Sequence, residues 1–454
     1  MPPVGGRCSR RKRSPVGVLA VAVAFVVLLF PSSAHAYGWM IKHGYGGCAT
    51  CHADPSGGEL LTRYGRAQSD LLLRMRYGSD TVSPQASRAP STSGGDFDSF
   101  ESFDKVAAAT ARTPAAAPAA AAEQQAAPSR SSGFLWGLVE PPDWLLLGGS
   151  LRSMEILRAT GSPTLRAFPM MMDLYGQGQI GIVRAEASVG AARVPEGLPY
   201  ARAAQVTTNQ GDGWNMISRT HWVGVDLGAA RYLLRAGRVN LPFGVRMPEH
   251  TTWVRQKTRT DRESSQQHGL ALAYTGDSLR GEIMAIAGNY QINPDVFRER
   301  GYSMFAEWLA SPRAAIGISS LVTHAGDDRF NPEGKPVWRQ VHGALARASP
   351  FDSFVLLAEA DAILKSRNSA GYVGFVQGDW ELVQGLHFML TGEVLDEGKP
   401  SGVSAPAAPG FGQPRFGGWL STDWFFLPHV EARIDAVLRQ KESFMVLGQV
   451  HVFL

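Results

Sequence analysis

From Asp143 to the C-terminus, the sequence alternates between polar and apolar residues with a period of two. In the segment HVEARIDAVLRQ, the charged residues fall on one parity and the apolar residues on the other. In SFVLLAEADAIL, Glu359 and Asp361 lie on the face opposite to Phe354 and Leu356. Such alternation is typical of β-strands with one wet face and one apolar face. Most of this chain is therefore predicted to fold as amphipathic strands.

We count about sixteen such segments of roughly 9 to 15 residues, the length of a tilted strand that crosses a bilayer. Their approximate centres are Gly148, Leu174, Glu186, Val223, Arg235, Leu272, Met284, Phe305, Ser319, Leu345, Ala358, Phe375, Leu390, Leu420, Asp435 and Gly448. Short links between segments alternate with long ones.

This pattern resembles that of bacterial porins over residues 143–454. The resemblance implies a mainly β fold, a closed antiparallel transmembrane barrel of about sixteen strands in the outer membrane of a Gram-negative bacterium, in contact with its lipid. Many outer-membrane barrels end on an aromatic residue, whereas here the aromatic Phe453 is penultimate. A large soluble β-sandwich or propeller is the alternative.

The N-terminus has the features of an export signal. The basic stretch RRKR precedes an apolar run from Val16 to Phe30 and the small-residue sequence AHA. These features predict a signal peptide over 1–36, with an uncleaved membrane anchor as the alternative. Cleavage would remove Cys8 and leave Cys48 and Cys51 as the cysteines of the mature chain.

Cys48-Ala49-Thr50-Cys51-His52 is a C-x-x-C-H sequence, and it resembles the attachment site of c-type haem. The resemblance implies one covalent haem c, with thioethers to Cys48 and Cys51 and with His52 as the proximal ligand of the iron. Residues 37–78 resemble the short mono-haem modules of exported bacterial proteins. A Cys48–Cys51 disulfide, a zinc site that includes His43, and chance occurrence are the alternatives.

Apolar residues recur near a period of 3.6 between Glu59 and Arg76, which predicts a helix whose apolar face packs on the porphyrin. The module offers Met75, His43 and Met40 as a second axial ligand, and a five-coordinate iron is the remaining alternative. Met75 lies on the predicted helix, and ligation by its thioether would raise the reduction potential.

Residues 79–132 are rich in Ala, Pro, Ser and Gly and bury too little apolar surface to offset the entropy of ordering, which predicts a disordered linker. The domain order is therefore signal peptide, haem module (37–78), linker and barrel (133–454). An even strand count brings both ends of the barrel to the short-turn, periplasmic side. The haem module would then lie in the periplasm or plug the lumen from below.

The longest loop, 240–267, carries five basic and three acidic residues. Long porin loops often fold inward, where a ring of basic residues favours anions. The mixture of charges nevertheless favours a mixed-charge external loop, and the inward basic ring is the alternative.

The net charge of +4 gives no sign of nucleic-acid binding, and no catalytic constellation is evident, so no enzymatic activity is expected. The first functional hypothesis is electron transfer by a periplasmic haem tethered to the barrel, with periplasmic redox proteins or multihaem cytochromes as partners. The alternative is a porin for small solutes, with anions among the candidates, in which the haem module is a sensor, gate or accessory.

Overall fold

The computed structural model describes residues 38–58, 60–75, 134–159, 162–194, 213–247, 249, 251–262, 264–289, 295–330, 332–401 and 407–454. The predicted signal peptide, Cys8 and the predicted linker lie outside these residues, so the predictions made for them stay predictions.

Seventeen strands of the described part of the chain form one large sheet. They are β1 (Leu145–Arg158), β2 (Thr164–Ile180), β3 (Val183–Val194), β4 (Gly213–Ile217), β5 (His221–Leu227), β6 (Tyr232–Val239), β7 (Gln267–Thr275), β8 (Leu279–Gly288), β9 (Arg300–Ser311), β10 (Ala314–Ala325), β11 (Val337–Phe351), β12 (Phe354–Lys365), β13 (Gly371–Val383), β14 (Leu386–Asp396), β17 (Arg415–Leu427), β18 (Val430–Arg439) and β19 (Met445–Phe453). A separate pair of very short strands, β15 (Ala408–Pro409) and β16 (Gly412–Gln413), lies in the connection before β17.

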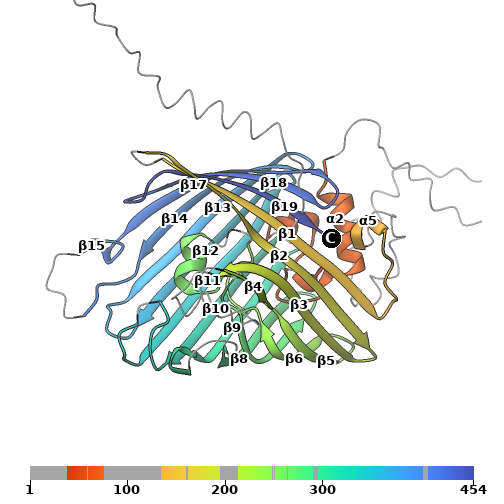
Figure 1. Ribbon diagram of the computed structural model, residues 1–454, viewed down its shortest axis with the longest axis horizontal. Coiled ribbons are helices and arrows are strands. Elements are labelled where there is room, and N and C mark those ends of the chain that lie inside the picture. The colour runs from red at the N-terminus through yellow and green to blue at the C-terminus, as the bar shows by residue number, and fades with distance from the viewer. Residues whose placement is uncertain are drawn as a thin grey trace, which may run out of the picture.

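The sheet closes into a barrel, because β1 pairs with β2 on one side and with β19 on the other (Figure 1). β4 and β5 both pair with β3, at opposite ends of it, so they are two pieces of one interrupted strand. The seventeen strands therefore occupy sixteen positions, all in antiparallel pairing. The predicted barrel of sixteen strands is confirmed, and each predicted segment centre lies within an observed strand.

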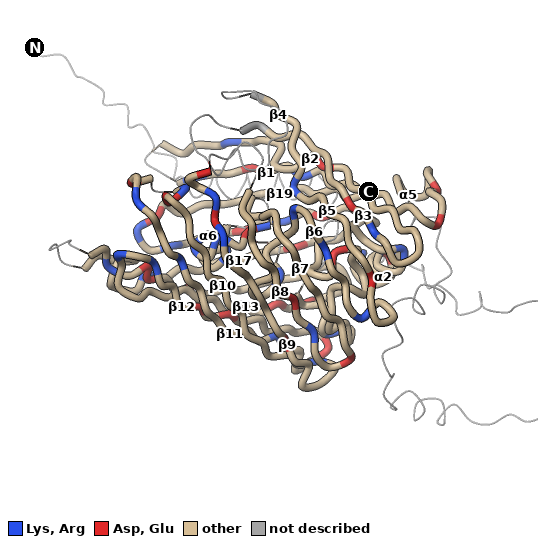
Figure 2. The backbone as a smooth tube through the Cα atoms, turned by 90° about the horizontal axis from the view of Figure 1, so that it is seen from below, with Lys and Arg blue, Asp and Glu red and all other residues tan. Residues whose placement is uncertain are grey.

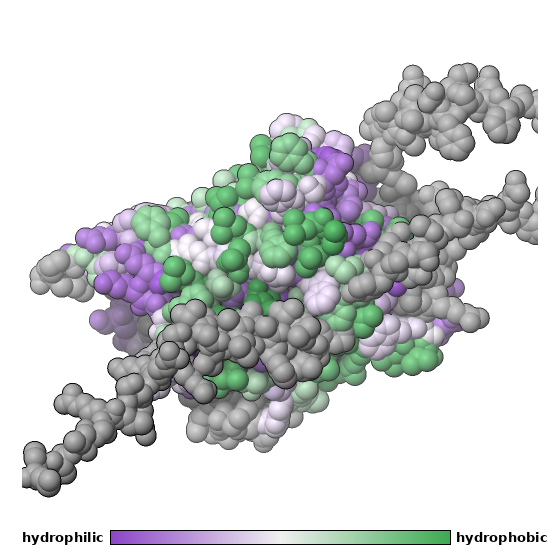
Figure 3. Space-filling model, turned by 90° about the horizontal axis from the view of Figure 1, so that it is seen from above, coloured by the Kyte–Doolittle hydropathy of each residue, from purple (hydrophilic) through white to green (hydrophobic). Residues whose placement is uncertain are grey.

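The period-two alternation of the sequence becomes an alternation between lumen and exterior. In β18, Glu431, Arg433 and Asp435 are buried on the lumen side, whereas Leu438 on the other parity is 66% exposed. Large apolar side chains are exposed on most other strands as well, and hydrophobic groups (green) spread over the outer face in Figure 3. The wet face of each strand is thus the inside of the barrel.

Exposed aromatic side chains form two belts around the outside. One belt lies at the short-turn end and contains Trp144, Tyr232, Trp308, Phe351 and Trp380. The other lies at the long-loop end and contains Phe168, Trp214, Tyr302, Trp338, Tyr372 and Phe416. Aromatic girdles at both interfaces are a feature of barrels that span a membrane.

The helical segments in the described part of the chain are short. They are η1 (Gly38–His43), η2 (Cys48–Thr50), α2 (Arg63–Leu72), α5 (Phe134–Gly137), α6 (Trp253–Thr258) and η6 (Asp295–Phe297). No helix among the described residues has both the length and the apolar character needed to cross a membrane.

The helix expected from Glu59 to Arg76 is shorter than predicted. It begins at Arg63 because the Thr62 hydroxyl caps it, accepting a hydrogen bond from the Gly65 amide at 3.0 Å. The preceding residue, Leu61, instead pairs with His52 in an isolated β-bridge.

Candidate functional site

The segment 38–75, which we call the plug, lies inside the lumen at the short-turn end of the barrel. Figure 1 shows α2 next to the C-terminus of the chain, at this end. The Met75 amide donates to the Phe425 carbonyl at 2.6 Å, and His429 Nε2 lies 3.2 Å from Asp70 Oδ1. Lys42 forms an ion pair with Glu381. Of the two predicted placements of this segment, the structure therefore has the one in which it plugs the lumen.

Arginines of the wall and the long loop hold the plug deeper in the barrel. Arg235 of β6, fully buried, lies 2.7 Å from Asp54 and 2.5 Å from Glu282. Arg347 of β11 donates to the Gly46 carbonyl at 2.7 Å, and Arg262 donates to the Gly57 carbonyl at 2.8 Å. Buried charged hydrogen bonds of this kind fix the orientation of the two parts they join.

The C-x-x-C-H sequence forms a tight turn that is braced by the residues after it. The His52 amide donates to the Cys48 carbonyl at 2.9 Å, and the Thr62 amide donates to the Cys51 carbonyl at 2.9 Å. A Cβ atom on Gly65 would lie 2.1 Å from the Cys51 carbonyl oxygen. The close approach of α2 to the motif therefore requires glycine at position 65.

His52 is buried, with an exposed fraction of 3%. Its Nδ1 lies 3.0 Å from both the amide nitrogen and the carbonyl oxygen of Gly58. Its Nε2 is buried and has no hydrogen-bond partner among the described residues. The ring is therefore fixed through one nitrogen, and the other nitrogen is available to a ligand.

The two cysteine thiols are free and sit in different electrostatic surroundings. Arg280 Nη1 lies 3.3 Å from Cys48 Sγ. Burial raises the pKa of Cys48, but Arg280 and Arg347 outweigh this effect and bring the pKa below its usual value. Burial raises the pKa of Cys51 to about 12, and burial lowers the pKa of His52 to about 4, so the imidazole is neutral at neutral pH.

A cavity lies between the plug and the barrel, and Cys48, Cys51 and His52 of the motif line it. Its lining consists of Gly38, Met40, Tyr45, Gly47, Cys48, Cys51, His52, Leu61, Gly65, Gln68, Ser69 and Leu73 from the plug, with Gly244, Val245, Arg246, Arg280, Phe305, Glu307 and Arg347 from the loop and wall.

The three candidates for a second axial ligand are placed differently. Met40 lines the cavity and packs against the buried apolar cluster. His43 is exposed, and neither His43 nor Met75 contributes to the lining. The structure thus brings together Cys48, Cys51, His52 and Met40, and the distal roles given to Met75 and His43 stay predictions.

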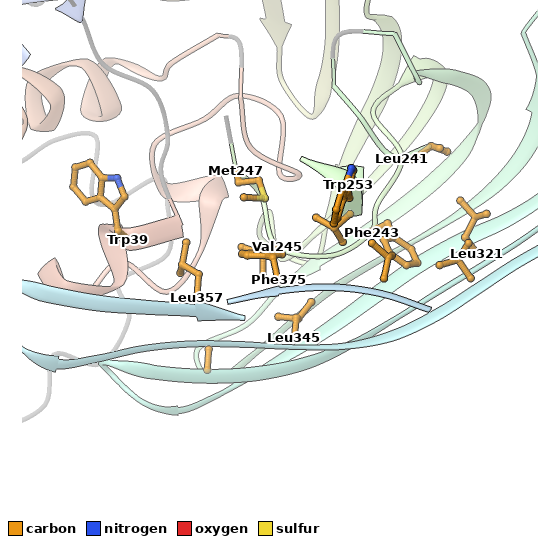
Figure 4. Packing of buried hydrophobic residues seen from close by; sticks show 14 of the residues in the cluster. Trp39, Leu241, Phe243, Val245, Met247, Trp253, Leu321, Leu345, Leu357 and Phe375 are labelled. Carbon is orange, nitrogen blue, oxygen red and sulfur yellow. The ribbon is translucent and has the colours of Figure 1, made fainter. Parts of the chain in front are cut away.

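The long loop, described here over 240–247, 249, 251–262 and 264–266, folds into the lumen. Figure 4 shows Leu241, Phe243, Val245 and Trp253 of this loop packed above wall residues that include Phe375. The Trp253 amide donates to Glu393 of β14 at 2.6 Å, across the barrel from the strands that the loop connects. The favoured prediction of an external loop is therefore wrong, and the loop lies inside the barrel.

The basic residues of this loop do not form a free cationic ring. Arg255 pairs with Glu359, Lys257 with Glu397, and Arg259 with both Glu299 and Asp328. Figure 2 shows acidic and basic positions interspersed along the strands around α6. The expected bias of the pore toward anions did not take these ion pairs into account, because the sequence alone does not show which wall carboxylates contact the loop.

The ion pairs of the loop lead to a prediction about stability. Arg255→Gln should cost about 3–5 kcal/mol, because it leaves a buried Glu359 carboxylate without its cation. Lys257→Gln, the matched control, should cost about 0–1 kcal/mol, since both partners of its pair are more than a quarter exposed. Urea unfolding of the detergent-solubilised protein, monitored by the loss of heat-modifiable gel migration, measures the stability of both variants. Equal losses in the two variants would contradict this assignment of the pairs.

A closed antiparallel barrel of sixteen positions, with an apolar exterior and two aromatic belts, is a porin-like transmembrane β-barrel of the outer-membrane type. No protein-family model matches the chain, and no curated protein matches its sequence.

Three solved outer-membrane structures resemble its fold at low sequence identity. A loop-deletion mutant of OmpT, an outer membrane protein of Vibrio cholerae, is 10% identical with a TM-score of 0.49, over 68% of this chain and 99% of that chain. Salmonella typhi OmpF in complex with daunomycin is 11% identical with a TM-score of 0.48, over 68% and 97%. The outer membrane channel DcaP of Acinetobacter baumannii is 11% identical with a TM-score of 0.46, over 68% and 97%.

Proposed function

We propose that this chain is an electron-transfer protein of the outer membrane that holds one covalent haem c inside its barrel. The observation that carries the proposal is the cavity that Cys48, Cys51 and His52 line together, where the buried Nε2 of His52 has no partner among the described residues. A redox-titrated visible spectrum of the purified protein tests it. A reversible c-type spectrum is the expected result, and a protein without visible absorbance would overturn the proposal.

The residues present fit a haem group. The two thiols stand at the edge of one cavity, where they are positioned to form thioethers. The His52 imidazole is neutral and fixed through Nδ1, and its buried Nε2 is without a partner among the described residues, as a proximal ligand requires. When bound, the haem iron would supply one-electron exchange. Leu61, Leu73, Val245 and Phe305 contribute apolar surface to the lining and would help to keep water from the ring.

We further propose Met40 as the distal ligand, because it shares the cavity with His52 and the other two candidates do not. Met40→Ala is then expected to change the visible spectrum and to lower the reduction potential by on the order of 0.1 V, within the range of about 0.8 V that axial ligands span. Met75→Ala, the matched control, should leave both unchanged. A spectral change in Met75→Ala with a wild-type spectrum in Met40→Ala would reverse the assignment.

The plug lies at the short-turn end, which is the periplasmic end in barrels of this type. The haem would therefore exchange electrons with periplasmic redox proteins or multihaem cytochromes. One haem near this end does not span a membrane core about 30 Å thick, so transfer across the membrane would need further carriers.

A second candidate function, passage of small solutes, is supported by the porin-like barrel itself. The plug and the inward loop both occupy the lumen, so this function would require the plug to act as a gate. Planar-bilayer conductance distinguishes the two candidates: a large, steady conductance of the intact chain favours the porin.

A further inference from the structure

The charges that line the cavity are unbalanced. Arg246, Arg280 and Arg347 contribute three positive side chains, and Glu307 contributes one negative side chain. With His52 neutral, the described lining therefore has a net charge of +2. Uncompensated charge in a buried site is costly, and an anionic ligand would offset that cost.

Two of the arginines share a single carboxylate. The Nε atoms of Arg280 and Arg347 lie 2.5 Å and 2.8 Å from the Glu307 carboxylate. Because one carboxylate stands between two guanidinium groups, one of their two positive charges stays uncompensated.

Arg246, on the inward loop, has no ion-pair partner among the described residues. Its Nη2 donates to the Leu241 carbonyl at 2.7 Å. Desolvation, together with nearby Arg262, lowers the pKa of Arg246 to about 10, and the attraction of Glu282 and Asp54 does not offset this effect. It is therefore the lining residue best suited to receive an external anion.

We propose that Arg246, together with the charge left over by Arg280 and Arg347, binds the two propionates of the haem. This proposal rests on the proposed function. Haem combines an apolar ring with two carboxylates, whose charge of about −2 at neutral pH matches the net charge of the lining. The guanidinium fork suits carboxylates because it donates two parallel hydrogen bonds. The long loop of the barrel thus supplies part of the haem site, and the plug supplies the attachment.

The charge of Arg246 would also set the reduction potential. A nearby cation favours addition of an electron to the haem, and this effect is large where water is excluded. In the full-length protein, Arg246→Gln should keep its covalent haem, because Cys48 and Cys51 make the attachment. It should shift the reduction equilibrium against the reduced form by about tenfold, which is a fall of about 59 mV for a one-electron couple.

Two further variants separate this role from a general loss of charge or structure. Lys257→Gln removes one positive charge from the same loop but outside the lining, and its equilibrium should stay within about twofold of wild type. Arg246→Lys keeps the charge and should restore most of the potential. Its propionate bending bands in the resonance Raman spectrum should still differ from wild type, because lysine lacks the guanidinium fork.

Equal potentials in Arg246→Gln and Lys257→Gln would overturn the proposal. So would unchanged propionate bands in Arg246→Lys, which also serves as the test if Arg246→Gln does not fold. A wild-type protein without covalent haem would overturn the proposed function, and this proposal with it.

Discussion

Replacing both Cys48 and Cys51 with alanine is expected to abolish covalent haem while leaving the barrel folded. The two thiols lie on the plug, outside the strand pairing that closes the barrel, so their loss removes no ladder hydrogen bond. Haem staining after denaturing electrophoresis measures the loss, and heat-modifiable migration reports the fold. Haem staining of the double variant at the wild-type level would contradict attachment at these positions.

His52→Ala provides the companion measurement. The thiols remain, so we expect covalent haem to persist with an altered spectrum and potential, because the proximal ligand is gone. A wild-type spectrum in this variant would exclude His52 as the ligand.

Deleting residues 37–132 is expected to raise the single-channel conductance severalfold. The deletion removes the plug from the short-turn mouth and frees Arg235 from Asp54, as well as Arg347 from the Gly46 carbonyl.

Asp54→Asn in the full-length chain is the control for this deletion. It removes one charge of the pair with Arg235 but leaves the plug in place, so its conductance should stay near wild type. Equal conductance in the deleted and intact chains would mean that the plug does not obstruct the lumen.

The barrel could be predicted from the sequence because each strand carries its own evidence. Glu431 and Arg433 lie on one parity and Ile434 on the other, a difference that is visible within a single strand. In the structure, one parity faces the lumen and the other faces the exterior. The interruption between β4 and β5 was not predicted, because the residues around Ser218 do not change the number of strand segments that the sequence suggests. The aromatic belts were also missed, because Trp308 and Trp380 come from strands distant in sequence and gather only in the folded barrel.

The candidate site was predictable only in part. The C-x-x-C-H spacing predicts that Cys48, Cys51 and His52 act together; the structure places all three on one cavity, and their role toward haem stays a proposal. The arginines that complete the cavity were not identifiable, because contacts such as Arg280 with Cys48 join residues 232 positions apart. Met75 was favoured over Met40 because it lay on the predicted helix. In the structure, α2 ends before Met75, whose amide donates to the Phe425 carbonyl of the wall, and Met75 does not line the cavity.

Quantification of covalent haem in the folded wild-type protein tests the central claim most directly. The protein would be expressed in a host with haem-attachment machinery, extracted from the outer membrane and checked for heat-modifiable migration. We predict one iron and one covalent haem for each chain. A folded barrel that carries no haem, with Cys48 and Cys51 joined in a disulfide, would contradict electron transfer and leave only the porin.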